Sequence, residues 1–225
     1  MEAKHPEFKK GEDHFREKRI NKIIESLKKN GINAKYFQTH QEAVDWLMEK
    51  LPDNGIVGVG GSRTLLQIGL IDRLIETSQT GRIKFLDRWS DTIDKKTEAQ
   101  TRYDNLSADV FITSSNAITL DGKLVNIDGL GNRVAAMMFG PKKVYFIVGR
   151  NKIVKDVEAG IDRARNVAAA QNAARFGMPT ICRETGICDE KNCYGTRICN
   201  IVTIIERGNL PNRMMVLMVN EDLGY

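Results

Sequence analysis

The sequence lacks any apolar run long enough to cross a bilayer. Its longest apolar stretches, 144–148 and 214–219, are far shorter than the roughly 20 residues that a spanning helix needs. Residues 1–10 carry several charges but no apolar segment of the kind found in secretory signals. We therefore expect a cytoplasmic protein without a membrane span.

Histidine is scarce, and neither sign of charge is collected in one place. The chain has three histidines, near its N-terminus or at a predicted helix start, which argues against histidine-based nucleophilic catalysis. The net charge is +5, with Lys and Arg interleaved with Asp and Glu. This pattern argues against a nucleic-acid partner, whereas a mild basic excess suits a small anionic molecule.

Hydrophobic patterning predicts one α/β domain over residues 1–225, because strands and helices alternate along the chain. We expect helices at 12–30, 40–50, 65–75, 92–103, 132–139 and 155–176. We expect strands at 33–37, 55–59, 83–86, 109–113, 117–120, 123–127, 143–148, 201–206 and 213–220. The alternation predicts a mostly parallel sheet with helices on both faces. The Asp121–Gly122 hairpin signal and the last two strands indicate an antiparallel addition.

A glycine-rich loop follows the predicted strand 55–59 and enters a helix. Glycines there allow close backbone approach and positive φ, and free N–H groups at a helix start favour an anion. The loop matches neither a Walker A motif nor GxGxxG. The alternative is a tight turn that Ser62 caps. The expected anion-binding residues are Gly58, Gly60, Gly61, Ser62, Arg63 and Thr64.

A second glycine-rich loop follows the predicted strand 123–127. Asp128 is placed to act as a catalytic base or to hold a ligand hydroxyl. Ligands collect at the carboxyl ends of parallel strands, which indicates the loops after residues 59, 113 and 127. The alternative is a structural turn with a helix cap. The remaining expected ligand-binding residues of this loop are Gly129, Gly131, Asn132 and Arg133.

All four cysteines fall in the segment 182–199, at Cys182, Cys188, Cys193 and Cys199. In a reducing compartment such clustering favours a metal over disulfides, so we expect four thiolates that hold zinc or an iron–sulfur cluster. The C-x5-C-x4-C-x5-C spacing decides neither metal. Free buried thiols or a redox pair are the alternatives.

The chain resembles the LUD-domain family of lactate-utilization proteins. The resemblance is carried by Gly58–Ser62, by Asp128–Arg133 with the strand 144–148 behind it, and by the tail Val219–Tyr225. The cysteine segment resembles a cysteine-bearing subset of that family. The resemblance implies a fold similar to ribose-5-phosphate isomerase, glucosamine-6-phosphate deaminase and the CoA transferases, whose phosphate site corresponds to the first glycine loop.

The resemblance also implies a part in the oxidation of lactate or a related organic acid, alongside iron–sulfur partner proteins. Two other functions stay open at this point. One is a sugar-phosphate isomerase or acyl/CoA transferase that uses the same loop, and the other is a metal or redox sensor or an assembly protein. Whether the chain is an enzyme, and whether it forms homo-oligomers, stays open too.

Overall fold

The computed structural model describes residues 6–89, 93–208 and 210–225. The strands are β1 (Asn33–Phe37), β2 (Gly55–Val59), β3 (Ile83–Phe85), β4 (Val110–Thr113), β5 (Ala117–Thr119), β6 (Leu124–Asp128), β7 (Lys143–Gly149), β8 (Ile153–Val154), β9 (Ile201–Ile205) and β10 (Met214–Val219). The helices are α1 (Pro6–Lys29), α2 (His40–Lys50), α3 (Arg63–Gln67), α4 (Leu70–Gln79), α5 (Lys95–Asp104), α6 (Asn132–Met138), α7 (Val157–Arg163), α8 (Ala170–Arg175) and α9 (Ile181–Thr185). Short 3₁₀ turns η1 (Asn105–Ser107) and η2 (Arg150–Lys152) and a π-helical segment η3 (Ala164–Ala169) complete them.

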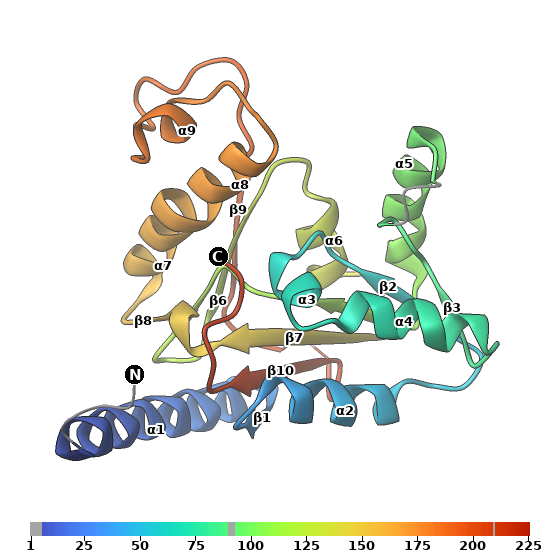
Figure 1. Ribbon diagram of the computed structural model, residues 1–225, viewed down its shortest axis with the longest axis horizontal. Helices are drawn as coiled ribbons and strands as arrows, with labels where there is room; N and C mark the ends of the chain where they lie inside the picture. Colours follow the sequence, from blue (N-terminus) through green and yellow to red (C-terminus); the bar gives the residue numbers. More distant parts are fainter. Residues whose placement is uncertain (1–5, 90–92, 209) are drawn as a thin grey trace.

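Six parallel strands form the main sheet, in the order β1-β10-β7-β4-β2-β3 (Figure 1). A second sheet, in the order β8-β5-β6-β9, contains the predicted hairpin, and β5 and β6 pair antiparallel around Gly122. Gly122 has a φ of +81°, which suits the expected Asp-Gly turn. The α/β fold with a mostly parallel sheet is therefore confirmed.

The last two strands differ from the expectation that both belong to an antiparallel addition. β9 does pair antiparallel with β6, but β10 lies between β1 and β7 in the parallel sheet. β10 is buried on nearly every residue, as a central parallel strand should be. The sequence of β10 is apolar throughout, and such a run does not indicate which of the two sheets the strand belongs to. This explains why the prediction for β10 is wrong.

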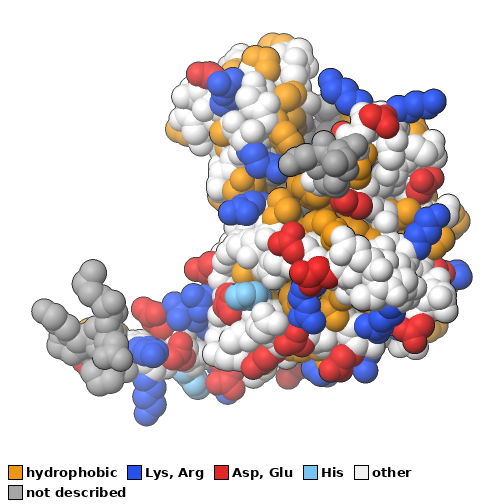
Figure 2. Space-filling model, turned by 45° about the vertical axis from the view of Figure 1, so that its right-hand side comes forward, with side chains coloured by type: hydrophobic (Ala, Val, Ile, Leu, Met, Phe, Trp, Pro, Cys, Tyr) orange, Lys and Arg blue, Asp and Glu red, His pale blue; other side chains and the backbone are white. Residues whose placement is uncertain are grey.

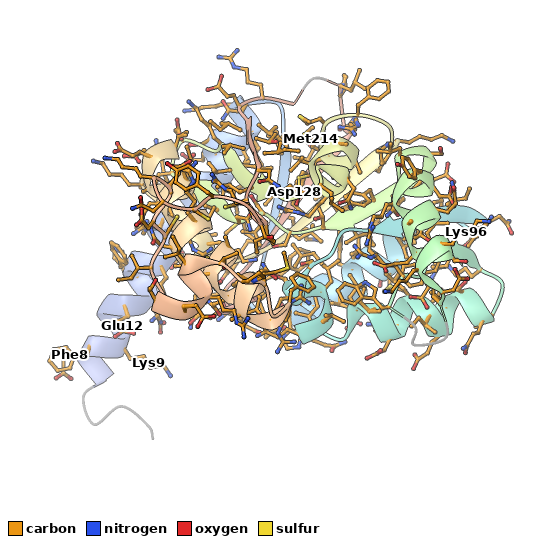
Figure 3. The ribbon with its side chains drawn as sticks, turned by 90° about the horizontal axis from the view of Figure 1, so that it is seen from above. Phe8, Lys9, Glu12, Lys96, Asp128 and Met214 are labelled. Carbon is orange, nitrogen blue, oxygen red and sulfur yellow. The ribbon has the colours of Figure 1, made fainter. Side chains whose placement is uncertain are left out.

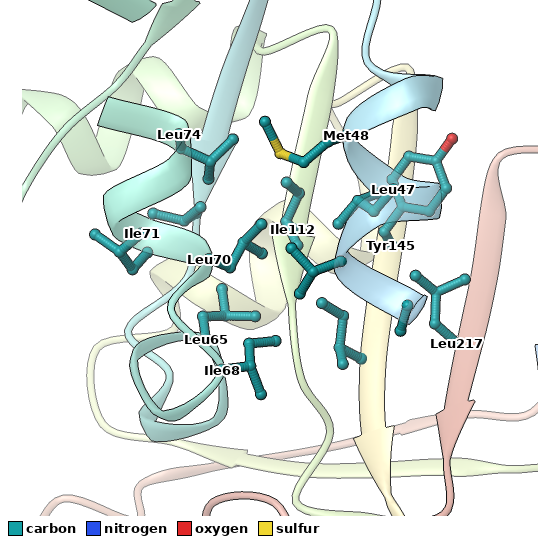
Figure 4. Close-up of a cluster of buried hydrophobic side chains, with 14 of the residues drawn as sticks. Leu47, Met48, Leu65, Ile68, Leu70, Ile71, Leu74, Ile112, Tyr145 and Leu217 are labelled. Atoms are coloured by element: carbon teal, nitrogen blue, oxygen red, sulfur yellow. The ribbon is translucent and has the colours of Figure 1, made fainter. Parts of the chain in front are cut away.

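Side chains of the central strands alternate between two cores. Val110, Ile112, Tyr145 and Ile147 face the helices α2, α3 and α4, where they pack with the residues drawn in Figure 4. The intervening Phe111 and the other alternate positions face α1, α6 and the second sheet. Helices therefore cover both faces of the main sheet, as period-two alternation in each strand requires.

Local signals set several element boundaries. Thr39 caps α2, accepting from the N–H of Glu42, whose carboxylate accepts in turn from the N–H of Thr39. Gly31, with a φ of +71°, ends α1 where the sequence predicted a stop. The expected start of α5 at Thr92 lies outside the described residues. No helix in the described ranges is both long and apolar enough to span a membrane.

Candidate functional site

A pocket of about 380 Å³ lies where the carboxyl ends of β2, β4, β6 and β7 meet. The chain leaves β2 towards α3 and α4 on one face of the main sheet, whereas the elements after β4 include α6 on the other face. The pocket therefore occupies the point where the strand order reverses, the usual ligand position in an open parallel sheet. In the view from above, Asp128 lies inside the molecule among side chains of several elements (Figure 3).

The first glycine loop contributes one wall of this pocket, through Gly61, Ser62, Arg63 and Thr64. Ser62 is the N-cap of α3, and its hydroxyl accepts from the N–H of Leu65 at 3.5 Å. Ser62 is 7% exposed, so its hydroxyl is buried as well as engaged in the cap. The sequence-based alternative of a Ser62 cap thus describes the local structure, and the same residues border the pocket.

The glycines of this loop serve packing, and the expectation of positive φ is wrong for them. None of Gly58, Gly60 and Gly61 is among the described glycines with positive φ. A Cβ on Gly58 would lie 2.0 Å from Asn105 Oδ1, and one on Gly60 would lie 2.8 Å from Thr113 Oγ1. Neighbouring side chains fill the space that these two glycines leave, while Gly61 alone of the three borders the pocket.

Asp128 lines the pocket and caps α6. Its Oδ2 accepts from the backbone N–H groups of Arg133 and Val134 at 3.1 and 3.2 Å, and its Oδ1 accepts from Arg133 Nε at 3.2 Å. Gly131 precedes α6 with a φ of +89°, a conformation that favours glycine. Gly129 and Asn132 border the pocket as well.

The guanidinium group of Arg133 is buried and holds the two sheets' strand ends together. Nη1 donates to Ser114 O at 3.1 Å and to Asn126 Oδ1 at 2.9 Å. Nη2 donates to Asn116 Oδ1 at 3.1 Å and to Ile127 O at 3.0 Å. With Nε on Asp128, the protein itself occupies every nitrogen of this group. Arg133 therefore shapes the floor of the pocket.

Sequence reasoning missed several pocket residues. Lys152 follows β7 in η2, and Arg175 lies at the end of α8. Arg88 and Arg102 both donate to Glu98, at 3.1 and 2.6 Å. The rule that ligands collect at the carboxyl ends of parallel strands indicates the loops after β2, β4 and β6. The same rule, applied to the end of β7, would have indicated Lys152. The arginines carried no such signal, since they come from segments that only the tertiary fold brings to the pocket.

The pocket carries a strong excess of basic side chains. Its basic lining residues are Arg63, Arg88, Arg102, Arg133, Lys152 and Arg175, and its acidic ones are Glu98 and Asp128. Within the described residues, Glu98 pairs with Arg88 and Arg102, and Asp128 pairs with Arg133. Arg63, Lys152 and Arg175 have no acidic partner in that part of the chain. Elsewhere the surface mixes the two signs, as on the face in Figure 2.

Arg175 shows how crowded the positive charges are. Burial lowers the pKa of its guanidinium, and Tyr225 acts in the opposite direction. Arg63 and Arg88 lower this pKa further, so both lie within electrostatic range of Arg175. The Arg175 guanidinium also lies 4.1 Å from the centre of the Phe176 ring, within cation–π range.

The predicted helix 155–176 is interrupted by the π-helical segment η3, whose Ala164, Ala168 and Ala169 line the pocket. π-Helical turns inside α-helices are frequent at functional sites. From the same segment, Asn166 Oδ1 accepts from the N–H of Cys188 at 2.9 Å. η3 therefore contacts both the pocket and the cysteine segment, and Ile198 of that segment lines the pocket too.

Cys182 lies in α9, and the other three cysteines lie between α9 and β9; all four residues are half-buried. Burial raises the pKa of Cys188, and Cys199 and Cys182 raise it further. Arg197 Nη2 contacts Cys199 Sγ at 3.6 Å. In the described part of the chain, no three His, Cys, Asp or Glu side chains are gathered closely enough to hold a metal ion. The residue types suit zinc or an iron–sulfur cluster, but the conformation would have to draw the sulfurs together.

Comparison with known proteins places the chain in a family. A crystal structure of a DUF162 family protein from Deinococcus radiodurans superposes with a TM-score of 0.50 at 12% sequence identity, covering 91% of this chain and 98% of that one. That likeness shows a shared fold. No curated protein matches the sequence. The model of the LUD domain matches residues 20–219, and the chain therefore belongs to the LUD-domain family.

Proposed function

We propose that this chain binds a small anionic metabolite in the pocket and takes part in the oxidation of lactate or a related organic acid. Membership of the LUD-domain family supports a role related to lactate utilization. The observation that carries the binding proposal is a pair of basic side chains at the pocket, Arg63 and Arg175, for which the described residues supply no acidic partner. A bound anion would supply the missing negative charge.

Arginine suits this task because its planar group donates two parallel hydrogen bonds to a carboxylate or phosphate. Arg63 reaches the pocket from the first glycine loop and Arg175 from the end of α8, so the two come from distant parts of the sequence. Burial lowers the pKa of Arg175 first and Arg63 lowers it further, and an anion bound beside these two groups would offset both effects. Ser62 and Thr64 extend the same wall of the proposed ligand site.

Asp128 is the proposed acid–base group of this site. A carboxylate offers about four lone-pair positions, of which Arg133 and Val134 use three. About one lone-pair position therefore stays free to accept a proton from a ligand. Gly129, Gly131, Asn132 and Arg133 complete the proposed site by fixing the position of this carboxylate.

Isothermal titration with L-lactate and pyruvate tests the binding proposal. Loss of one charge-assisted hydrogen bond costs about 1.5–3 kcal/mol, so Arg63→Gln and Arg175→Gln should each weaken binding roughly tenfold to hundredfold. Arg16→Gln is the matched control, because Arg16 pairs with Glu12 and Asp13 on α1. Unchanged affinity in both pocket variants, or equal weakening in the control, contradicts the proposed site.

A second proposal concerns the cysteine segment, in which Cys182, Cys188, Cys193 and Cys199 hold zinc or an iron–sulfur cluster after a local rearrangement. The confinement of all four cysteines of the chain to residues 182–199 supports it. Elemental analysis and visible absorbance of protein purified without oxygen test the proposal. We expect iron or zinc in the wild type and loss of that metal in Cys193→Ser. Metal-free wild-type protein contradicts it.

A further inference from the structure

Lys152 is a buried lysine whose amine reaches the centre of the candidate site. Its side chain extends from η2, directly after β7, and the residue is 3% exposed while it borders the pocket. Nζ lies 2.9 Å from Thr64 Oγ1 in the first glycine loop and 2.9 Å from Ser114 Oγ directly after β4. Three strand ends therefore meet at this nitrogen.

The surroundings of Lys152 favour its neutral amine. Within the described residues no carboxylate lies at ion-pair distance from Nζ, and the two charged groups that act on its pKa, Arg163 and Arg133, are both basic. Burial, then Arg163, then Arg133 lower the pKa of Lys152 well below its ordinary value. Arg163 itself donates to the backbone oxygens of Asn116 and Tyr225, at 2.6 and 3.2 Å.

The two hydroxyl partners accept from the amine. Ser114 Oγ donates its own proton to Ile147 O at 2.6 Å, and Thr64 Oγ1 lies 3.4 Å from Leu223 O. A neutral amine has two N–H donors and one lone pair, so these two acceptors hold both N–H groups. The remaining position of the nitrogen belongs to the lone pair, which is the group that attacks a carbonyl carbon.

We propose that Lys152 is a nucleophile that forms an imine with a small anionic carbonyl compound, of the 2-oxo acid class. This inference rests on the proposed anion site, in which the arginines bind the acid group. The amine lone pair forms a C–N bond with the carbonyl carbon, and one amine proton passes to the carbonyl oxygen, giving a carbinolamine. Loss of water, formed from the carbinolamine hydroxyl and the second amine proton, gives the neutral imine. No oxidant or reductant is needed for this step.

The substrate class follows from the two halves of the pocket. A neutral buried amine selects a carbonyl group, whereas Arg63 and Arg175 select a carboxylate or phosphate. A 2-oxo acid carries both groups on adjacent carbons. Oxidation of a 2-hydroxy acid yields a 2-oxo acid, so the inferred ligand class is compatible with the proposed role in organic-acid oxidation.

Reductive trapping tests this inference on the full chain. The protein is incubated with pyruvate and sodium cyanoborohydride at pH 7, and peptide mapping by mass spectrometry locates the adduct. At that pH an exposed lysine, with a pKa near 10.4, is almost wholly protonated and reacts poorly. We expect one lysine adduct per chain, on Lys152, with much less from acetone, a ketone that lacks the acid group, and none from L-lactate, which lacks the carbonyl.

Two variants control the experiment. Lys152→Met should lose the adduct, whereas Lys155→Met should keep it, because the side chain of Lys155 is 87% exposed. Circular dichroism checks whether each variant is folded. If Lys152→Met does not fold, the position of the adduct in the wild type decides whether Lys152 reacts. Pyruvate binding in calorimetry without any adduct on Lys152 overturns the amine chemistry and leaves the proposed function intact. Absence of both binding and adduct overturns the two together, and adducts spread over surface lysines overturn the site assignment.

Discussion

Replacement of Arg133 by methionine should lower the free energy of unfolding by more than the loss of an exposed ion pair does. The variant removes five side-chain hydrogen bonds, to Asp128, Ser114 O, Asn126, Asn116 and Ile127 O. The side chains of Arg133 and Asp128 are 10% and 14% exposed, so solvent cannot replace the lost donors fully. Breaking a buried pair of this kind costs about 3–5 kcal/mol.

Thermal unfolding followed by circular dichroism measures the effect. In a chain of this length 1 kcal/mol corresponds to roughly 2–4 °C, so Arg133→Met should lower the Tm by about 10 °C. Arg16→Met is the matched control, because the exposed pairs of Arg16 are worth about 0–1 kcal/mol. A loss in Arg133→Met no larger than in Arg16→Met would refute the assignment of Arg133 as the support of the pocket floor.

Three further predictions concern the same region. Gly58→Ala should lower the free energy of unfolding in urea by about 1–3 kcal/mol, because the new Cβ would lie 2.0 Å from Asn105 Oδ1. Gly11→Ala in α1 is the control and should not destabilise the protein, because its Cβ would have no neighbour within 4 Å; equal losses in the two variants would contradict the packing argument. Lys152→Met should raise the free energy of unfolding at pH 7. Because the pKa of Lys152 is lowered in the folded state, the unfolded chain binds one more proton than the folded chain at pH values below about 10.5. The stability of the wild type therefore rises as the pH approaches that value, and the difference in stability between Lys152→Met and the wild type shrinks. A difference that does not change with pH would contradict a neutral buried amine. Asp128→Asn should abolish turnover of a lactate-type substrate in an assay that supplies the natural electron acceptor of the protein, while the affinity for pyruvate stays within a few-fold of the wild-type value. Full activity of this variant would show that Asp128 is not the base.

Strand and helix positions could be predicted largely from local patterns. The Thr39 capping box, the Gly31 stop and the Asp121–Gly122 turn each act over a few residues, so the sequence shows them directly. The position of β10 between β1 and β7 could not be predicted, because an all-apolar strand fits any central place in a parallel sheet.

The candidate site was predictable where it lies at strand ends and unpredictable elsewhere. The two glycine loops follow β2 and β6, and both reach the pocket as the topology rule requires. Arg88 and Arg175 reach it from the segment after β3 and from the end of α8, through tertiary packing alone. The glycine pattern predicts close ligand approach at Gly58 and Gly60, but Asn105, Thr113 and Arg133 occupy the space beside them. A glycine pattern alone does not distinguish these two uses.

A crystal structure of the protein with pyruvate tests the central claim most directly. We predict the carboxylate in the pocket, about 2.7–2.9 Å from a guanidinium nitrogen of Arg63 or Arg175, with the keto carbon next to Lys152 Nζ. Pyruvate bound elsewhere on the molecule, with those two arginines turned away from it, would contradict the account.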